Sequence, residues 1–147
     1  MLRHSAGFEH TYLPDAEVIL KQIGEKKGWQ VRTTHHCQRV SAETLADTDL
    51  LIFATTGNLP FEKEQKQALL DFVKGGKPFF GIHNATDTFS DWPEYGELIG
   101  GYFSGHPWTQ EVGVIVEDDD HPATRMLGQY FKVFDEIYTF KAWDRNK

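Results

Sequence analysis

The chain has 147 residues, of which 39% are hydrophobic and 25% are charged, a composition typical of one globular domain with its own core. Its net charge of −7 argues against a nucleic-acid-binding protein, because phosphate neutralisation needs clustered Lys and Arg. The sequence has neither an apolar run of roughly 18 residues nor a basic-then-apolar leader. We therefore expect a cytoplasmic protein that binds a small molecule, with no nucleic-acid or membrane partner.

Helices and strands are predicted to alternate in the first two thirds of the chain. Apolar side chains recur at helical spacing, or form continuous runs bounded by polar turns, which indicate helices and strands respectively. Pro14 and Gly28 are typical residues for the start and end of a helix, and Ser41 is expected to cap a short helical turn. The helices are expected at residues 15–27 and 61–74, and the strands at 29–34, 50–54 and 78–82.

Strands separated by helices of this length predict a doubly wound, mainly parallel α/β sheet with helices on both faces. The 78–82 strand is expected to be buried on both faces. Residues 111–117 and 133–143 predict an antiparallel extension, and the acidic run 118–120 is interpreted as a turn because it lacks calcium-loop spacing. We predict a single domain over residues 1–147, cut short at both ends, since only a four-residue stub precedes the Gly7 loop and the chain stops directly after a strand.

Three histidines are expected in loops where strand ends meet. His83 follows the 78–82 strand, at the carboxyl edge where ligands bind in open α/β sheets, and His10 and His106 lie in two other loops. Neutral imidazole is a ligand for divalent first-row metals and also a general base. The three histidines could hold one divalent metal ion, or each could hydrogen-bond to the backbone of its own turn.

Cys37, the one cysteine of the chain, and its neighbours His35 and His36 are not predicted to form a second metal site. Cys37 is alone, which excludes an internal disulfide. Its neighbours His35 and His36 could bind a metal, but no second cysteine completes a zinc pattern. We interpret this cluster as a solvated turn.

Short polar and aromatic side chains follow His83. Asn84 and Asp87 are interpreted as ligand contacts, suited to sugar hydroxyls, whereas Thr88 and Ser90 are expected to cap the next helix. The aromatic residues of this region could pack in the core or form platforms under the apolar faces of sugars. They are Trp92, Tyr95, Tyr102, Phe103 and Trp108.

Two carboxylates, Asp135 and Glu136, stand in a strand-like run that is otherwise rich in apolar residues. Buried carboxylates in general can act as an acid or a base, because burial raises their pKa. A surface salt bridge is the alternative. Glu136 is therefore a candidate for proton transfer.

Several segments together resemble the ThuA-like (trehalose utilisation) family, whose members are similar in fold to the flavodoxin-type class I glutamine amidotransferases. The segments are GFEHTYLP at 7–14, GIHNATDT at 81–88, DWPEYGELIGGYFSGHP at 91–107, DDDHPATRMLG at 118–128 and DEIYTF at 135–140. The resemblance implies that His83 replaces the amidotransferase nucleophilic cysteine. It therefore implies that the protein is not a glutamine amidotransferase, and Cys37, in an early loop, cannot take over that role.

The resemblance further implies a sugar-catabolic enzyme that cleaves a 3-keto disaccharide or glycoside beside a sugar dehydrogenase. The keto group acidifies the adjacent C–H, so elimination or hydrolysis becomes accessible. His83 or Glu136 would move the proton, while a divalent metal on His10, His83 or His106 would polarise the keto oxygen. The substrate-binding candidates are Asn84, Asp87, Trp92, Tyr95 and Tyr138.

A second hypothesis keeps the fold and pocket without the chemistry. In that case the chain is a non-catalytic carbohydrate-binding or regulatory domain. Neither hypothesis calls for a nucleotide cofactor, and both allow a homo-oligomer. Mutation of His83 or Glu136 separates them, because it should abolish turnover and spare ligand affinity only in an enzyme.

Overall fold

A computed structural model describes residues 1–146, which form two compact units. Unit 1 comprises residues 1–102 together with the C-terminal residues from Ala142, and unit 2 comprises Phe103–Lys141. Each unit is considered by itself, and the single domain over residues 1–147 stays a prediction. Within the described residues, no helix combines the length and the apolar character that a membrane crossing requires.

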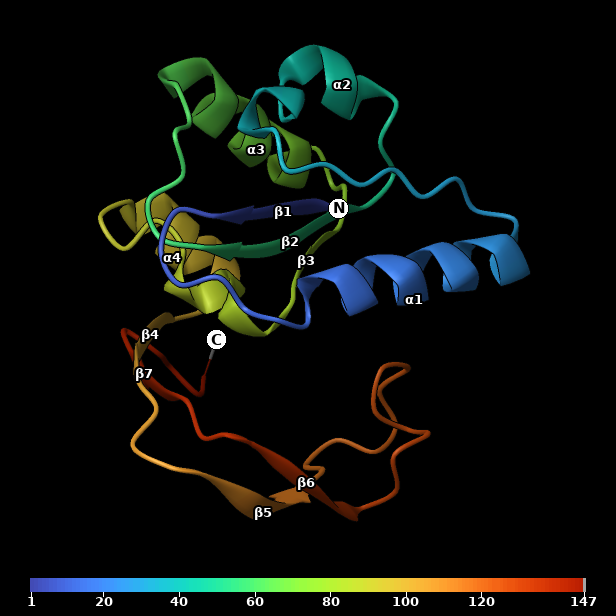
Figure 1. The fold of residues 1–147 in the computed structure, drawn as a ribbon, viewed down its shortest axis with the longest axis vertical. Helices are drawn as coiled ribbons and strands as arrows, with labels where there is room; N and C mark the ends of the chain where they lie inside the picture. Colours follow the sequence, from blue (N-terminus) through green and yellow to red (C-terminus); the bar gives the residue numbers. More distant parts are fainter. Residues whose placement is uncertain (147) are drawn as a thin grey trace. The chain divides into compact units, whose positions relative to one another are not determined.

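Unit 1 is built on a parallel sheet with strand order β1-β2-β3 (Figure 1). In the register, Leu2 of β1 and Phe79 of β3 pair with Phe53 and Leu51 of β2. The elements are, in chain order, β1 (Leu2–Ser5), α1 (Leu13–Lys27), η1 (Cys37–Arg39), α2 (Ala42–Ala46), β2 (Leu51–Thr56), α3 (Lys63–Lys74), β3 (Phe79–Gly81), η2 (His83–Asp87) and α4 (Pro93–Ile99). The expected α/β class with a parallel sheet is confirmed.

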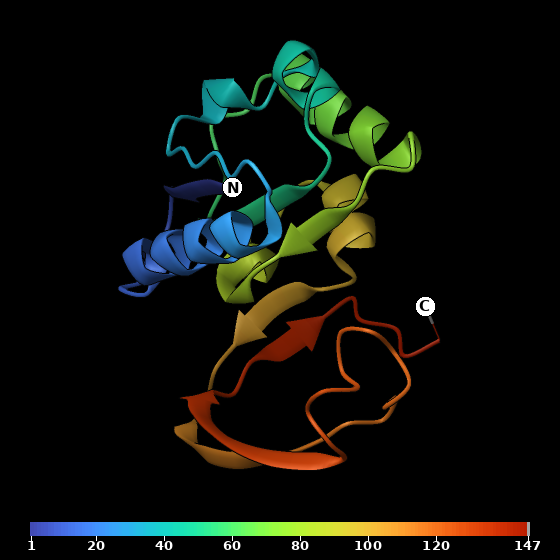
Figure 2. The ribbon, with the colours of Figure 1, turned by 90° about the vertical axis from the view of Figure 1, so that its right-hand side faces the viewer.

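Helices lie on both sides of this sheet. Figures 1 and 2 show α2 and α3 on one side and α1 on the other. Alternate side chains of a strand point to opposite faces, and Phe53, which is 0% exposed, belongs to the core cluster that α2, α3 and α4 share. Its ring lies 5.0 Å from that of Phe79 and 6.1 Å from that of Phe61. This aromatic core fixes β2 at the centre of unit 1.

The helix boundaries follow from local chemistry. Pro14 stands in the first turn of α1, and Gly28 ends that helix in the left-handed conformation with φ 72°. The side chain of Ser41 accepts a hydrogen bond from the Thr44 amide at 3.3 Å, as expected for a cap of α2. The second predicted helix begins two residues late, at Lys63. The four turns of α1 and the capped start of α2 are therefore confirmed.

Two strand predictions are wrong in detail. Residues 29–34 form no strand, because their only bridge joins Thr34 to Leu2 and Trp29 is 61% exposed. The backbone of Arg32 and Thr34 bonds to Met1 and Arg3 beside β1, but this contact is too short to form a strand. The strand predicted at 78–82 is present as β3, but Phe80 is 55% exposed, so it is not buried on both faces. In the described sheet β3 is an edge strand, and Phe80 pairs with Ile52 on the face opposite Phe79.

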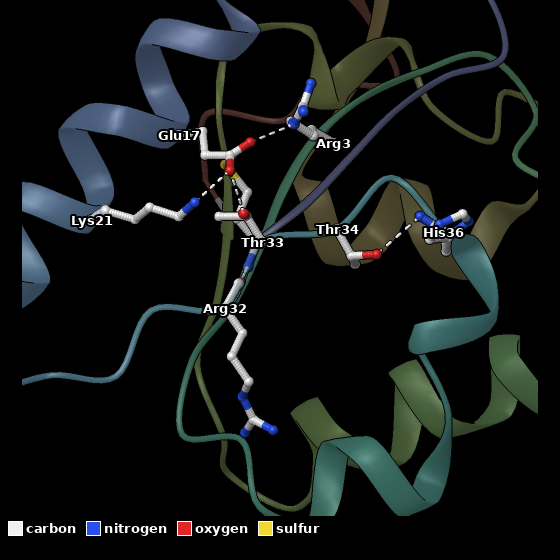
Figure 3. Close-up of polar contacts among 8 residues, drawn as sticks. Arg3, Glu17, Lys21, Arg32, Thr33, Thr34 and His36 are labelled. Atoms are coloured by element: carbon white, nitrogen blue, oxygen red, sulfur yellow. Dashed lines mark hydrogen bonds and ion pairs between the residues drawn. The ribbon is translucent and has the colours of Figure 1, made fainter.

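An ion-pair network ties α1 to the sheet (Figure 3). The carboxylate of Glu17 lies 2.7 Å from Nε of Arg3 and 2.6 Å from Nζ of Lys21, and it accepts a hydrogen bond from Thr33 Oγ1 at 2.7 Å. The hydrogen bonds from Lys21 and Thr33 lower the pKa of Glu17 from 4.5 to about 2. Glu17 is therefore the electrostatic link between α1 and β1.

A pH-dependent loss of stability is expected from Glu17. A depressed carboxyl pKa stabilises the fold above the unfolded value of 4.5, and this contribution disappears as the pH falls toward 2. Glu17→Gln should lower the free energy of unfolding at pH 7 by about 1–2 kcal/mol, after allowance for solvent screening of the partly exposed partners. Denaturant titrations at several pH values should show this difference vanish near pH 2. A constant difference at every pH would contradict the assignment, and Glu25→Gln, on the exposed surface of α1, is the matched control.

Unit 2 is antiparallel. Its strands are β4 (Tyr102–Gly105), β5 (Thr109–Ile115), β6 (Tyr130–Glu136) and β7 (Thr139–Lys141), where Tyr102 still belongs to unit 1. β5 pairs with β6 antiparallel, with Val112 opposite Val133, and β4 pairs with β7. Oδ1 of Asp118 accepts hydrogen bonds from the amides of Asp120 and His121 at 3.1 Å. The predicted antiparallel extension and its acidic turn are both confirmed.

Candidate functional site

The carboxyl end of β2 holds two loops of unit 1 in place. Thr56 Oγ1 donates a hydrogen bond to the Phe8 carbonyl at 2.7 Å, which anchors the loop that bears His10. Thr88 Oγ1 donates to the Thr55 carbonyl at 2.8 Å, which anchors the loop that bears His83. Both threonines of β2 and Thr88 are fully buried. The expectation that Thr88 caps the next helix is wrong, because its hydroxyl is used in this contact and Trp92 is the N-cap of α4.

His83 is the first residue of η2, on the sharp turn that follows β3. β3 ends at Gly81, and the backbone of His83 has φ 43°. Residues other than glycine rarely adopt this left-handed conformation. Such strain is concentrated at functional sites, where the surrounding structure enforces it. A Cβ atom on Gly81 would lie 2.6 Å from Ile99 Cδ1 and 3.0 Å from Ala85 Cβ, so the end of β3 packs closely against these side chains. The turn has the strand-to-helix form that exposes a catalytic side chain at a sheet edge.

His10 and His83 are in contact. Their ring centroids lie 4.8 Å apart, edge to face, and one potential ligand nitrogen of each lies within 4.8 Å of the other. The ring of Tyr12 lies 5.8 Å from His10 and 5.7 Å from His83, so the three rings form one cluster. Two of the three predicted metal-ligating histidines therefore meet at the carboxyl edge of the parallel sheet, as expected from the topology.

A buried amide and a phenol complete this cluster. The Tyr12 hydroxyl donates a hydrogen bond to Oδ1 of Asn84. Burial raises the pKa of Tyr12 to about 12, so its hydroxyl stays protonated at neutral pH. Asn84 is 0% exposed, and its Nδ2 has no hydrogen-bond partner among the described residues. The site thus contains an unused donor, which is a feature of ligand-binding positions.

Three further candidates belong to unit 2. His106 is exposed and stacks on Tyr138 with ring centroids 6.0 Å apart, and Phe103 lies 4.5 Å from Tyr138. Glu136 is partly buried at the end of β6, where it pairs with Thr109. His106 as a metal ligand and Glu136 as a proton-transfer group stay predictions from the sequence.

The aromatic candidates of α4 pack in the core of unit 1. Tyr95 is 0% exposed, and its hydroxyl donates to the Ala85 carbonyl at 2.8 Å. Burial also raises the pKa of Tyr95 above its ordinary value. Trp92 is 7% exposed and stacks on Tyr95 with centroids 5.9 Å apart. Both side chains therefore pack in the core and do not line a binding surface. Asp87 is partly buried in η2, and its carbonyl accepts a hydrogen bond from the Gly57 amide at 2.7 Å, so it stays a candidate for ligand contact.

Three residues of the site were not predicted from the sequence. Tyr12 lies outside the helix predicted at 15–27, and Thr55 and Thr56 lie just beyond the strand predicted at 50–54. The available signal was the switch from Leu51–Ala54 to two hydroxyl side chains at the strand end, where neighbouring loops need anchors. His35 and His36 are exposed, as predicted for a solvated turn, whereas Cys37 is buried at the start of η1.

Comparisons with known proteins agree with this fold. The family described as ThuA, trehalose utilisation, matches residues 1–147. The crystal structure of a ThuA-like protein from Bacteroides uniformis ATCC 8492 superposes with a TM-score of 0.78 at 22% sequence identity. The match covers 95% of this chain and 59% of that chain, so this chain spans about three fifths of the other protein. No curated protein matches the sequence. At this identity the structural likeness shows the fold alone.

Proposed function

Since this chain belongs to the ThuA (trehalose utilisation) family, we propose that it acts in sugar catabolism by cleaving a 3-keto disaccharide or glycoside. The observation that carries the proposal is the contact between His10 and His83, whose ring centroids lie 4.8 Å apart, with His83 on the strained turn after β3. Two imidazoles meeting at the ligand-binding edge of a parallel sheet suit acid–base or metal chemistry. The flavodoxin-like arrangement and the cytoplasmic location are part of the same proposal.

The two histidines fit a divalent metal ion. Imidazole nitrogens that share one metal at about 2.1 Å lie roughly 3 Å apart. The ligand nitrogens of His10 and His83 lie within 4.8 Å of each other, so small side-chain rotations suffice to bring them together. When bound, a divalent ion supplies Lewis-acid polarisation of the keto oxygen. The donor set of unit 1 is thus compatible with the cofactor that the sequence predicts.

The remaining residues have separate roles. His83 serves either as a metal ligand or as the general base, because one imidazole cannot fill both roles at once. If His83 is a ligand, proton transfer falls to Glu136, as predicted from the sequence. Asn84 offers its free Nδ2 donor, and Asp87 offers a carboxylate suited to sugar hydroxyls. His10 serves as a metal ligand, and the ring of Tyr12 contacts both imidazoles.

Turnover in deuterium oxide tests this function. The protein is incubated with 3-keto disaccharides and 3-keto glycosides, and the products are followed by mass spectrometry and NMR. Elimination removes the proton at C2, next to the keto carbon, and the leaving group at C1. Addition of D2O to the resulting enone should then place deuterium at C2, whereas direct hydrolysis should leave C2 protonated. Cleavage by either route supports the proposal. Binding of these sugars without any cleavage would support the carbohydrate-binding alternative, and neither binding nor cleavage would contradict both.

A further inference from the structure

The hydrogen bond between Tyr12 and Asn84 joins the two histidine-bearing loops directly. The Tyr12 hydroxyl donates to Asn84 Oδ1 across 72 positions of sequence. Tyr12 stands two residues after His10, and Asn84 follows His83 immediately. The contact therefore joins the loop of His10 to the turn of His83.

Ring packing reinforces this link. The Tyr12 ring lies 5.8 Å from that of His10 and 5.7 Å from that of His83, nearly equidistant, while the two imidazoles lie 4.8 Å apart. A phenol held between two imidazoles restricts the side-chain rotations that either ring can make. Its position is itself set by the hydrogen bond to Asn84, because without that bond the Tyr12 ring is held by packing alone.

The choice of asparagine at position 84 also needs an explanation. Asn84 is 0% exposed and its Nδ2 is unpaired among the described residues, and an unpaired buried donor costs free energy that an apolar side chain of similar size would avoid. Its Oδ1, in contrast, receives the Tyr12 hydroxyl. His83, directly before it, has φ 43°, and such a conformation persists only where the surrounding structure enforces it. Anchoring Asn84 constrains that turn.

We infer that Tyr12 is a positioning residue which, through Asn84, fixes the imidazole of His83 against that of His10. The inference concerns the preorganisation of the two side chains, and it rests on the proposed function only where metal binding is concerned. Partners one step removed from metal ligands orient them and typically change metal affinity by about 10- to 100-fold when removed. Tyr12 therefore sets how tightly the pair can hold an ion.

Proton NMR of the metal-free protein tests the positioning. In the unmodified chain we expect nuclear Overhauser cross-peaks between the ring protons of His10 and His83. Tyr12→Phe should remove or strongly weaken these cross-peaks, because phenylalanine keeps the ring and loses the hydrogen bond. Tyr102→Phe is the matched control, since the Tyr102 hydroxyl donates to the Trp92 carbonyl elsewhere in unit 1.

A second pair of variants guards against unfolding as the cause. Asn84→Asp keeps an acceptor for the Tyr12 hydroxyl and should retain the imidazole cross-peaks, whereas Asn84→Leu should lose them. Core resonances of Phe53 and Tyr95 report in each variant that unit 1 is folded. Cross-peaks that persist in Tyr12→Phe would overturn the inference, as would their equal loss in Asn84→Asp and Asn84→Leu with the core intact.

Cobalt(II) binding, followed by its visible absorption, gives an independent readout. Tyr12→Phe should raise the Kd for cobalt(II) by about tenfold or more, and Tyr102→Phe should leave it unchanged. An unchanged Kd in Tyr12→Phe would contradict the inference. If the unmodified protein binds no cobalt(II), the metal part of the proposed function fails, and the imidazole cross-peaks alone then decide on the positioning role.

Discussion

Replacing His83 by alanine is expected to lower the turnover of a 3-keto glycoside by about 10²- to 10⁴-fold, the contribution typical of one acid–base group. The loss should fall on kcat and leave KM nearly unchanged, because the imidazole acts at the reacting centre. His35→Ala, in the exposed turn before η1, is the matched control and should keep full activity. Turnover that survives in His83→Ala would remove His83 from the chemistry.

The metal content of the same variants decides which role His83 has. Protein purified without chelators should contain near-stoichiometric metal in the unmodified chain and in His35→Ala. If His83 is a ligand, both His10→Ala and His83→Ala should lose the metal. If His83→Ala loses turnover while no metal is found in any variant, His83 acts as the base. If His83 is a ligand, Glu136→Ala should also abolish turnover, because Glu136 then moves the proton.

Gly57→Ala is expected to destabilise the protein by about 2–4 kcal/mol. Gly57 has φ 73°, which costs an L-residue roughly 1–2 kcal/mol. A Cβ atom there would also lie 2.6 Å from the Gly7 nitrogen and 2.8 Å from the Ala6 carbonyl carbon. Both are backbone atoms that cannot rotate away, so overpacking adds about 1–3 kcal/mol. Denaturant titration measures the loss directly.

Gly28 offers a matched control for Gly57. It has φ 72°, but a Cβ atom there would meet nothing within 4 Å. Gly28→Ala should therefore show the conformational cost alone, about 1–2 kcal/mol. The difference in stability loss between the two variants then reports how closely Gly57 approaches the backbone of Ala6 and Gly7. Equal losses would show that the contact between Gly57 and the loop at Gly7 is less tight than described.

Periodicity and composition predicted most of unit 1, for physical reasons that particular elements show. Helix α1 was predictable because Pro14 and Gly28 mark its ends, and β2 because a continuous apolar run needs cover on both faces. The absence of a strand at residues 29–34 was not predictable, because strand pairing depends on a partner that the local sequence does not reveal. The exposure of Phe80 has the same origin, because position at the sheet edge is a property of topology.

The candidate site was predictable in part. The rule that ligands bind at the carboxyl edge of a parallel sheet placed His83 and His10 together, and the structure brings these two imidazoles into contact. Tyr12 and the threonines of β2 were missed, because hydrogen bonds between distant loops leave no local pattern. Tyr95 was assigned to the binding surface because an aromatic side chain on a short helix has the same local pattern whether it faces a ligand or the core.

The end of β2 also determines how the two loops can open. The Ala6 amide donates to the Thr56 carbonyl at 2.9 Å, while the Gly57 amide donates to the Asp87 carbonyl at 2.7 Å and the Phe89 amide donates to the Gly57 carbonyl at 3.2 Å. These backbone bonds meet on Thr56, the last residue of β2, and on Gly57, which directly follows it. Neither loop can therefore detach without disturbing the segment that restrains the other, and the two histidines gain or lose their order as one cooperative unit. The flexibility of both loops at the carboxyl end of β2 therefore depends on the aromatic core that packs against this strand.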